Sequence, residues 1–219
     1  YITKEVVAPS NLQRVVRLVQ LLNDRGGRLA IAVDSVEGVD NLARALSDVL
    51  PRDSPNCIDV FVEVDVGQGR CGVASPHDAL SLAQRIARHP SLRFAGLQAY
   101  HGGAQHIRST DERAMAIAAA VDKVSNTRAL ILAAAIQVPL ITGAGTGTFS
   151  LEATSGVYGE LQAGSYLFMD ADYRRNDKHG AQPDFQQALF IKSQVVSVNS
   201  AHAACDAGHK NHAIAGWAS

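Results

Sequence analysis

The sequence predicts an α/β protein: an incomplete (β/α)₈ TIM-type barrel followed by the start of a C-terminal β domain. Short β-rich runs alternate with helical patterns over residues 1–173, an alternation that produces a parallel sheet with helical crossovers. The clearest strand has one valine face and one carboxylate-bearing face. Polar, glycine-rich loops follow successive strands, at the end where barrels carry their chemistry.

Six strands are expected in the barrel region, at residues 2–7, 29–33, 58–66, 94–99, 140–142 and 160–162. Three helices carry start signals, which are Ser10 with Gln13, Ser75 before a proline, and Ser109 with Glu112. A further helix follows the second strand. Closure of a barrel takes about eight strand–helix units, so the predicted barrel is incomplete.

The residue pattern of segment 58–66 decides between two candidate architectures, a barrel and an open doubly wound sheet. Valine occupies every second position from 60 to 66, whereas Asp59, Phe61, Glu63 and Asp65 lie between them. A strand in the middle of an open sheet is apolar on both faces. Carboxylates near one end of a face favour a barrel interior. Glu63 and Asp65 could serve there as a pair for acid–base chemistry or metal binding, but we expect them to pair with neighbouring lysine or arginine.

The pattern changes after Tyr173. Residues 174–184 are polar and loop-like, and two strands are expected at 188–198 and 203–206 with no helix between them. We therefore assign residues 1–173 to the barrel and 174–219 to the start of a β domain. Asp206, His209 and Lys210 belong either to a turn in that domain or to the rim of a site.

Composition excludes several classes of protein. The 219 residues are 47% hydrophobic and 19% charged, with a formal net charge of -1, so no basic excess points to nucleic acid. No apolar run approaches the ~20 residues of a membrane-spanning helix. The three cysteines lack the spacing of a metal site. We expect reduced thiols in a cytoplasmic protein with neither a nucleic-acid nor a membrane partner.

Four polar loops follow strands, at residues 67–72, 98–103, 143–148 and 162–166, and should meet at one end of the sheet. The loop 143–148, Gly-Ala-Gly-Thr-Gly-Thr, can offer backbone N–H groups and threonine hydroxyls to a phosphate. It lacks the Lys-Ser/Thr ending of a nucleoside triphosphate loop. A tight structural turn is the alternative explanation.

Arg70, Tyr100 and His101 are the other candidate site residues that the loops suggest. Arg70 offers a permanent cation for a carboxylate, phosphate or phenolate, or it pairs with Asp65. His101 could serve acid–base chemistry or stack on a ring, or it is simply solvated, and His106 in the same loop is a weaker candidate.

Five motifs, in this order, resemble those of D-threonine aldolases. They are VEVDVGQGRCGV at 62–73, GLQAYHG at 96–102, ITGAGTG at 141–147, ELQAGSY at 160–166 with FMD at 168–170, and DAGHK at 206–210. The wider family includes D-serine and 3-hydroxyaspartate dehydratases and, more distantly, alanine racemase. The resemblance implies a pyridoxal 5'-phosphate (PLP) enzyme of fold type III, with a barrel, a β domain and a homodimeric assembly.

The resemblance also implies roles for individual residues. Arg70 matches an arginine near the phenolic oxygen of PLP, and Tyr100 and His101 match residues against the cofactor ring, where we expect the catalytic groups. Gln162 falls where the racemase has an arginine facing the pyridine nitrogen, and as a neutral amide it should leave that nitrogen less firmly protonated. The remaining cofactor-binding residues implied are Gln98, Gly145, Thr146, Gly147, Thr148, Gly164, Ser165 and Tyr166.

Two parts of the family site are expected outside the chain. The lysine that holds PLP lies on a strand upstream of Tyr1, and the divalent-metal ligands lie beyond Ser219. The resemblance therefore implies a PLP- and divalent-metal-dependent lyase that cleaves D-β-hydroxy-α-amino acids to glycine and an aldehyde. The alternatives are a D-serine or 3-hydroxyaspartate dehydratase, a non-catalytic PLP-binding protein or fragment, and a phosphate-binding barrel of unrelated chemistry.

Overall fold

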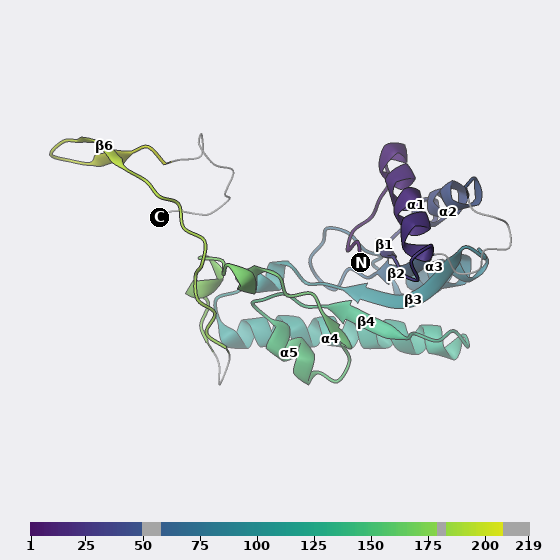
Figure 1. Cartoon of the computed structure of the whole chain (residues 1–219). Helices are drawn as coiled ribbons and strands as arrows, with labels where there is room; N and C mark the ends of the chain where they lie inside the picture. The colour runs from purple at the N-terminus through teal and green to yellow at the C-terminus, as the bar shows by residue number, and fades with distance from the viewer. Residues whose placement is uncertain (50–57, 179–182, 208–219) are drawn as a thin grey trace.

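A five-stranded parallel sheet forms the centre of the computed structural model, which describes residues 1–49, 58–178 and 183–207 (Figure 1). The strands are β1 (Ala30–Val33), β2 (Ile58–Glu63), β3 (Leu92–Ala99), β4 (Leu140–Gly143) and β5 (Glu160–Leu161). They follow one another in chain order across the sheet, all parallel. A doubly wound sheet reverses its strand order at a switch point, so this order confirms the α/β incomplete barrel.

Helices cover the valine face of the sheet. They are α1 (Pro9–Asn23), α2 (Val36–Ser47), α3 (Pro76–Ala87), α4 (Thr110–Ala133) and the short α5 (Phe149–Thr154). Val60, Val62 and Val64 of the β2 segment lie in one buried cluster with apolar side chains of α1 to α4, such as Val19 and Ile86. The expected valine layer under the helices is therefore confirmed.

The expected strand at residues 2–7 is wrong except at one residue. Ile2 donates its N–H to the carbonyl of Ala30 (2.8 Å) and accepts from the N–H of Ala32 (3.2 Å), which makes a single parallel bridge to β1. The helix after it begins at Pro9, with Ala8 as the N-cap residue. The predicted cap at Ser10 is wrong, because proline at the first helical position already supplies the helical φ.

The other two predicted caps are confirmed. Ser75 accepts a hydrogen bond from the N–H of His77 (3.1 Å) at the start of α3. Ser109 accepts one from the N–H of Glu112 (3.4 Å) at the start of α4. These bonds satisfy N–H groups that the first helical turn leaves unpaired.

Beyond the sheet, three 3₁₀ helices and one antiparallel hairpin complete the described chain. The 3₁₀ helices are η1 (Gly103–His106), η2 (Ser165–Leu167) and η3 (Tyr173–Arg175), and the hairpin pairs β6 (Val195–Val198) with β7 (Ala203–Cys205). The hairpin stands apart from the sheet (Figure 1). The strand expected at 188–198 is shorter in the structure, because residues 188–194 lie outside β6. At the start of the hairpin, the N–H of Gln194 donates to Asp206 Oδ1 (2.8 Å). His209 and Lys210 lie outside the described residues.

Candidate functional site

A cavity of about 330 Å³ opens where the loops after β2, β3, β4 and β5 meet. It is lined by Thr3, Arg70, Gln98, Tyr100, Gly145, Thr146, Gln162, Gly164, Ser165 and Tyr173. All of these except Thr3 and Tyr173 are predicted site residues. The loops converge because parallel strands place their carboxyl ends at the same edge of the sheet.

A polar row crosses four strands of the sheet in register, and its Gln98 side chain lies in the lining of the cavity. Glu63 of β2 is level with Gln98 of β3, Gln98 with Thr142 of β4, and Thr142 with Glu160 of β5. The Gln98 Nε2 donates to Glu63 Oε2 (2.7 Å), and Thr142 Oγ1 donates to Glu160 Oε1 (2.7 Å). Gln98 is 2% exposed, so its amide is held rigidly.

Gln162 joins the same network from the loop after β5. Its Nε2 donates to Thr142 Oγ1 (3.0 Å) and to Gln98 Oε1 (3.4 Å). Both N–H bonds of this amide are thereby used, and the group that Gln162 can still offer to the cavity is its Oε1, an uncharged acceptor.

Glu63 is held in its neutral form at pH 7. Burial, together with the neighbouring carboxyl group of Glu5, raises the pKa of Glu63 to about 8, although the hydrogen bond from Gln98 opposes the shift. The expected pairing of Glu63 and Asp65 with lysine or arginine is wrong. The partner of Glu63 is an amide, and Asp65 Oδ1 accepts the N–H groups of Gly67 (3.0 Å) and Gly69 (2.9 Å).

Arg70 therefore does not have Asp65 as its partner. Its side chain is exposed at the mouth of the cavity, and no ion pair within the described ranges engages it. Burial raises the pKa of Tyr100 on the same cavity, and the positive charge of Arg70 opposes that rise. Arg70 is thus a cation facing the cavity beside a phenol that stays protonated at neutral pH.

The loop after β4 is folded around a residue that the sequence reasoning missed, Gln105 of η1. The Gly147 N–H donates to Gln105 Oε1 (2.8 Å), and Gln105 Nε2 donates to Thr148 Oγ1 (2.8 Å). Thr148 Oγ1 donates in turn to Glu152 Oε1 (2.8 Å). Gln105 lies in a short 3₁₀ helix outside the periodic segments, so no sequence pattern marked it.

The predicted phosphate-binding residues fall into two groups. Gly147 and Thr148 are engaged within the protein and do not line the cavity. Gly145 and Thr146 do line it, and the hydrogen bonds of the described chain leave their N–H groups unpaired. Unpaired N–H groups beside hydroxyls are suited to an anion.

The segment after β5 closes this side of the cavity. The Tyr166 N–H donates to Thr146 Oγ1 (3.1 Å), which fixes Gly164 and Ser165 beside the glycine-rich loop. Tyr166 is 41% exposed as a residue, and its ring contacts Phe185, with 5.5 Å between ring centroids. Tyr166 therefore reaches the site through its backbone, whereas its ring lies outside the cavity lining.

His101 also lies outside the cavity lining. Its Nδ1 accepts the N–H of Ala104 (3.3 Å), and its ring packs so closely on Gly67 that a Cβ there would lie 2.9 Å from Nε2. Burial lowers the pKa of His101, and the charge of Asp65 opposes the shift. His101 is thus a neutral ring wedged between two site loops. His106, the weaker candidate, contacts Asp172 at the surface (2.6 Å).

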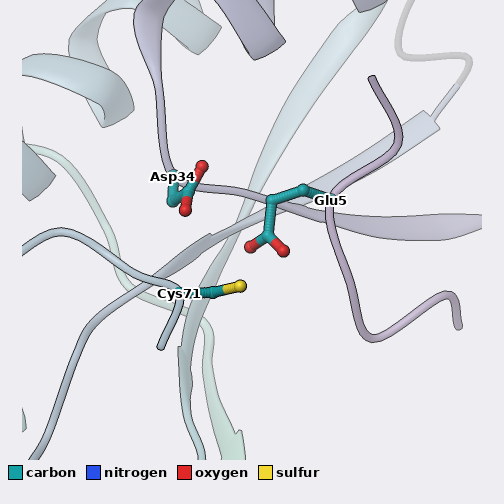
Figure 2. Close-up of side chains that lie close together, drawn as sticks. All are labelled: Glu5, Asp34 and Cys71. Atoms are coloured by element: carbon teal, nitrogen blue, oxygen red, sulfur yellow. The ribbon is translucent and has the colours of Figure 1, made fainter. Parts of the chain in front are cut away.

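A second side-chain cluster lies beside the cavity, where Glu5, Asp34 and Cys71 converge from three separate segments (Figure 2). One ligand atom from each lies within 4.8 Å of the other two. Burial and the charge of Glu5 raise the pKa of the Cys71 thiol, and Asp34 Oδ2 accepts the N–H of Gly72 (3.1 Å). A protonated thiol beside carboxylates is a common hydrogen-bonded arrangement, so we assign no metal to this cluster.

A sequential parallel sheet whose strand-end loops enclose a polar cavity is typical of α/β barrels, which carry their sites at this end. The chain belongs to the family "Alanine racemase, N-terminal domain", whose profile matches residues 8–172. Within this family it is similar to a D-threonine aldolase from Arthrobacter sp., with 40% identity over 90% of this chain and 49% of the relative. It is also similar to a 3-hydroxy-D-aspartate aldolase from Paracoccus denitrificans (strain Pd 1222), with 35% identity over 97% of this chain and 54% of the relative.

Solved structures agree with these sequence matches. The crystal structure of D-threonine aldolase from Filomicrobium marinum superimposes with a TM-score of 0.83 at 37% identity, covering 94% of this chain and 53% of that one. A D-threo-3-hydroxyaspartate dehydratase from Delftia sp. HT23 shares the fold, with a TM-score of 0.63 at 20% identity over 79% of this chain and 44% of that one. The chain spans about half the length of the curated relatives it matches.

Within residues 1–49, 58–178 and 183–207, no helix combines the length and the apolar character needed to cross a membrane.

Proposed function

We propose that the intact protein is a PLP- and divalent-metal-dependent lyase that cleaves D-β-hydroxy-α-amino acids to glycine and an aldehyde. The observation that carries the proposal is the convergence of a cation, a phenol and unpaired backbone N–H groups on one cavity, contributed by Arg70, Tyr100, Gly145 and Thr146. Relatives named as aldolases support carbon–carbon cleavage as the reaction. We further propose that the protein acts in the cytoplasm as a homodimer.

The cavity residues fit PLP. The volume of the cavity, about 330 Å³, lies at the lower end of the ~300–1,000 Å³ typical of ligand pockets. The phosphate would be held by the N–H groups of Gly145 and Thr146 and by the hydroxyls of Thr146 and Ser165. Arg70 would face the phenolic oxygen, whose negative charge a guanidinium stabilises.

Gln162 would face the ring nitrogen with its Oε1, because hydrogen bonds to Thr142 and Gln98 already use both of its N–H groups. When bound, PLP supplies the electron sink for a carbanion at the substrate Cα. A neutral acceptor holds a proton on the ring nitrogen less firmly than a carboxylate does. Such a moderate sink suits cleavage in which the departing aldehyde carries part of the charge.

Of the two expected catalytic residues, we propose Tyr100 for acid–base work and His101 as a positioning residue. Tyr100 lies on the cavity with its hydroxyl protonated at neutral pH, so it can donate a hydrogen bond to substrate or cofactor. His101 lies outside the cavity lining, and its neutral imidazole accepts the Ala104 N–H, which would position the loop after β3.

Product analysis of the intact protein tests the proposal. D-threonine and D-3-hydroxyaspartate are incubated with PLP and a divalent cation, with the L-enantiomers as controls. We expect glycine and an aldehyde in equal amounts from the D-substrates alone. A keto acid with ammonia would instead establish the dehydratase, and unchanged substrates in the presence of bound PLP would establish a non-catalytic binder.

A further inference from the structure

We infer that Gln105 is a positioning residue for the phosphate subsite, although its side chain lies outside the cavity. The inference rests on the proposed function, because the ligand whose phosphate is bound is PLP. Gln105 holds the glycine-rich loop in the one conformation that leaves the Gly145 and Thr146 N–H groups free for an anion.

Gln105 connects three segments that surround the cavity. Its side-chain amide accepts the N–H of Gly147 (2.8 Å) and donates to Thr148 Oγ1 (2.8 Å) and to the carbonyl of His101 (3.3 Å). Its own carbonyl accepts Asn176 Nδ2 (2.8 Å). Gln105 is fully buried, at 0% exposure, so these bonds meet no competition from water and fix the amide.

The shape of the loop matches this amide. A Cβ on Gly145 would lie 2.5 Å from Gln105 Oε1, and a Cβ on Gly147 would lie 3.1 Å from the same atom. Glycine at these positions therefore lets the backbone wrap around the Gln105 side chain. Ala144, just before them, adopts φ 68°, a left-handed conformation that a non-glycine residue keeps only when its surroundings impose it.

This arrangement divides the donors of the loop between protein and ligand. Gln105 takes up the Gly147 N–H, and the Gly145 carbonyl accepts the N–H groups of Thr148 (3.1 Å) and Phe149 (2.9 Å). The N–H groups of Gly145 and Thr146 are left at the cavity. Without the Gln105 amide, the Gly147 N–H would lose its partner and the loop could rearrange, which would misplace the two donors.

The position of Gln105 predicts a phosphate-selective defect. Replacing it with methionine keeps the length of the side chain and removes its hydrogen bonds. In the intact protein, we expect Gln105→Met to raise the Kd for PLP about tenfold or more while the Kd for pyridoxal, which lacks the phosphate, changes less than twofold. Equilibrium dialysis of both compounds measures the two constants.

A matched pair of threonine variants provides the control. Thr148→Val removes the hydroxyl that holds the Gln105 amide, and Thr127→Val removes an equally buried hydroxyl in α4 that donates only to the carbonyl of Lys123 (2.9 Å). We expect Thr148→Val to weaken PLP binding selectively, about threefold, and Thr127→Val to leave both Kd values unchanged. The double variant Gln105→Met with Thr148→Val should lose little more than Gln105→Met alone, because we expect Thr148 to act on the loop through the Gln105 amide, which the first substitution already removes.

Each outcome separates the inference from the proposed function. Equal losses of PLP and pyridoxal, or no loss of either, would overturn the positioning role of Gln105. Additive losses in the double variant would also overturn it, since Thr148 would then act on the phosphate independently. If Gln105→Met does not fold, the ratio of the two Kd values in Thr148→Val decides by the same criterion. Absence of PLP binding by the unaltered protein would overturn the proposed function itself.

Discussion

The Gln98 side chain, which lines the cavity, donates from Nε2 to Glu63 Oε2 across 2.7 Å and joins β3 to β2. This bond belongs to a row of polar side chains in register across the inner face of the sheet. The row fixes the amides that face the cavity, and it buries a carboxyl group that is neutral at pH 7. The pH dependence of stability should therefore report on it.

The unaltered protein should lose stability as the pH rises, because Glu63 ionises, and Glu63→Gln should abolish this loss. The folded-state pKa of Glu63, about 8, lies above its ordinary value of 4.5, so the folded protein binds this proton more tightly than the unfolded chain does. The contribution of this bound proton to the free energy of unfolding is complete below pH ~4.5 and is lost as the pH rises through about 8. The variant, which mimics the neutral acid, should gain a few kcal/mol relative to the unaltered protein between pH 5 and 8.5, since one pKa unit corresponds to ~1.4 kcal/mol.

Urea unfolding at pH 5, 7 and 8.5 measures this gain. Glu37→Gln, at an exposed position of α2, is the matched control and should keep the pH profile of the unaltered protein. A Glu63→Gln profile parallel to that of the unaltered protein would show that Glu63 titrates normally.

Arg70→Met should weaken PLP binding roughly tenfold, because a hydrogen bond to a charged group contributes ~1.5–3 kcal/mol. The side chain is exposed at the cavity mouth, so its removal should leave the melting temperature almost unchanged. Arg128→Met, at an exposed position of α4, controls for the loss of one positive charge. Equal PLP affinities in the two variants would remove Arg70 from the site.

Gly145→Ala should destabilise the fold, whereas Gly164→Ala should not. A Cβ on Gly145 would clash with the buried Gln105 amide, 2.5 Å from Oε1, whereas one on Gly164 would meet no atom within 4 Å. Overpacking of this kind costs ~1–3 kcal/mol. Thermal unfolding of both variants measures the difference, and two similar melting temperatures would refute the tight packing of the loop on Gln105.

Ala135→Gly should stabilise the protein. Ala135 follows the C-cap residue of α4 with φ 60°, a conformation that costs an L-residue ~1–2 kcal/mol and glycine almost nothing. The greater freedom of glycine in the unfolded chain offsets part of that gain, so we expect about 0.5–1 kcal/mol in urea unfolding. A loss of stability would mean that the helix does not end in this conformation.

Sequence patterns predicted the strands and most helix starts because these depend on neighbouring residues. Alternating valines marked β2, and serine caps marked α3 and α4. The N-terminal strand and the long strand at 188–198 were overpredicted, because apolar β-formers become a strand only where another strand pairs with them. Ile2 has one such partner segment, in β1.

Site residues that belong to sequence motifs were predictable, whereas hydrogen bonds between distant loops were not. The motifs named Arg70, Tyr100, Thr146 and Ser165, which share the cavity. They gave no sign that Gln105 would occupy the Gly147 N–H. Such a contact joins positions far apart in the chain, and its geometry arises only from the packing of two loops.

A crystal structure of the intact protein with PLP tests the central claim most directly. We expect phosphate oxygens within ~2.7–3.2 Å of the Gly145 and Thr146 N–H groups, the Ser165 hydroxyl beside them, and the Arg70 guanidinium facing the phenolic oxygen. A phosphate bound elsewhere in the molecule, with those N–H groups left to water, would contradict the account.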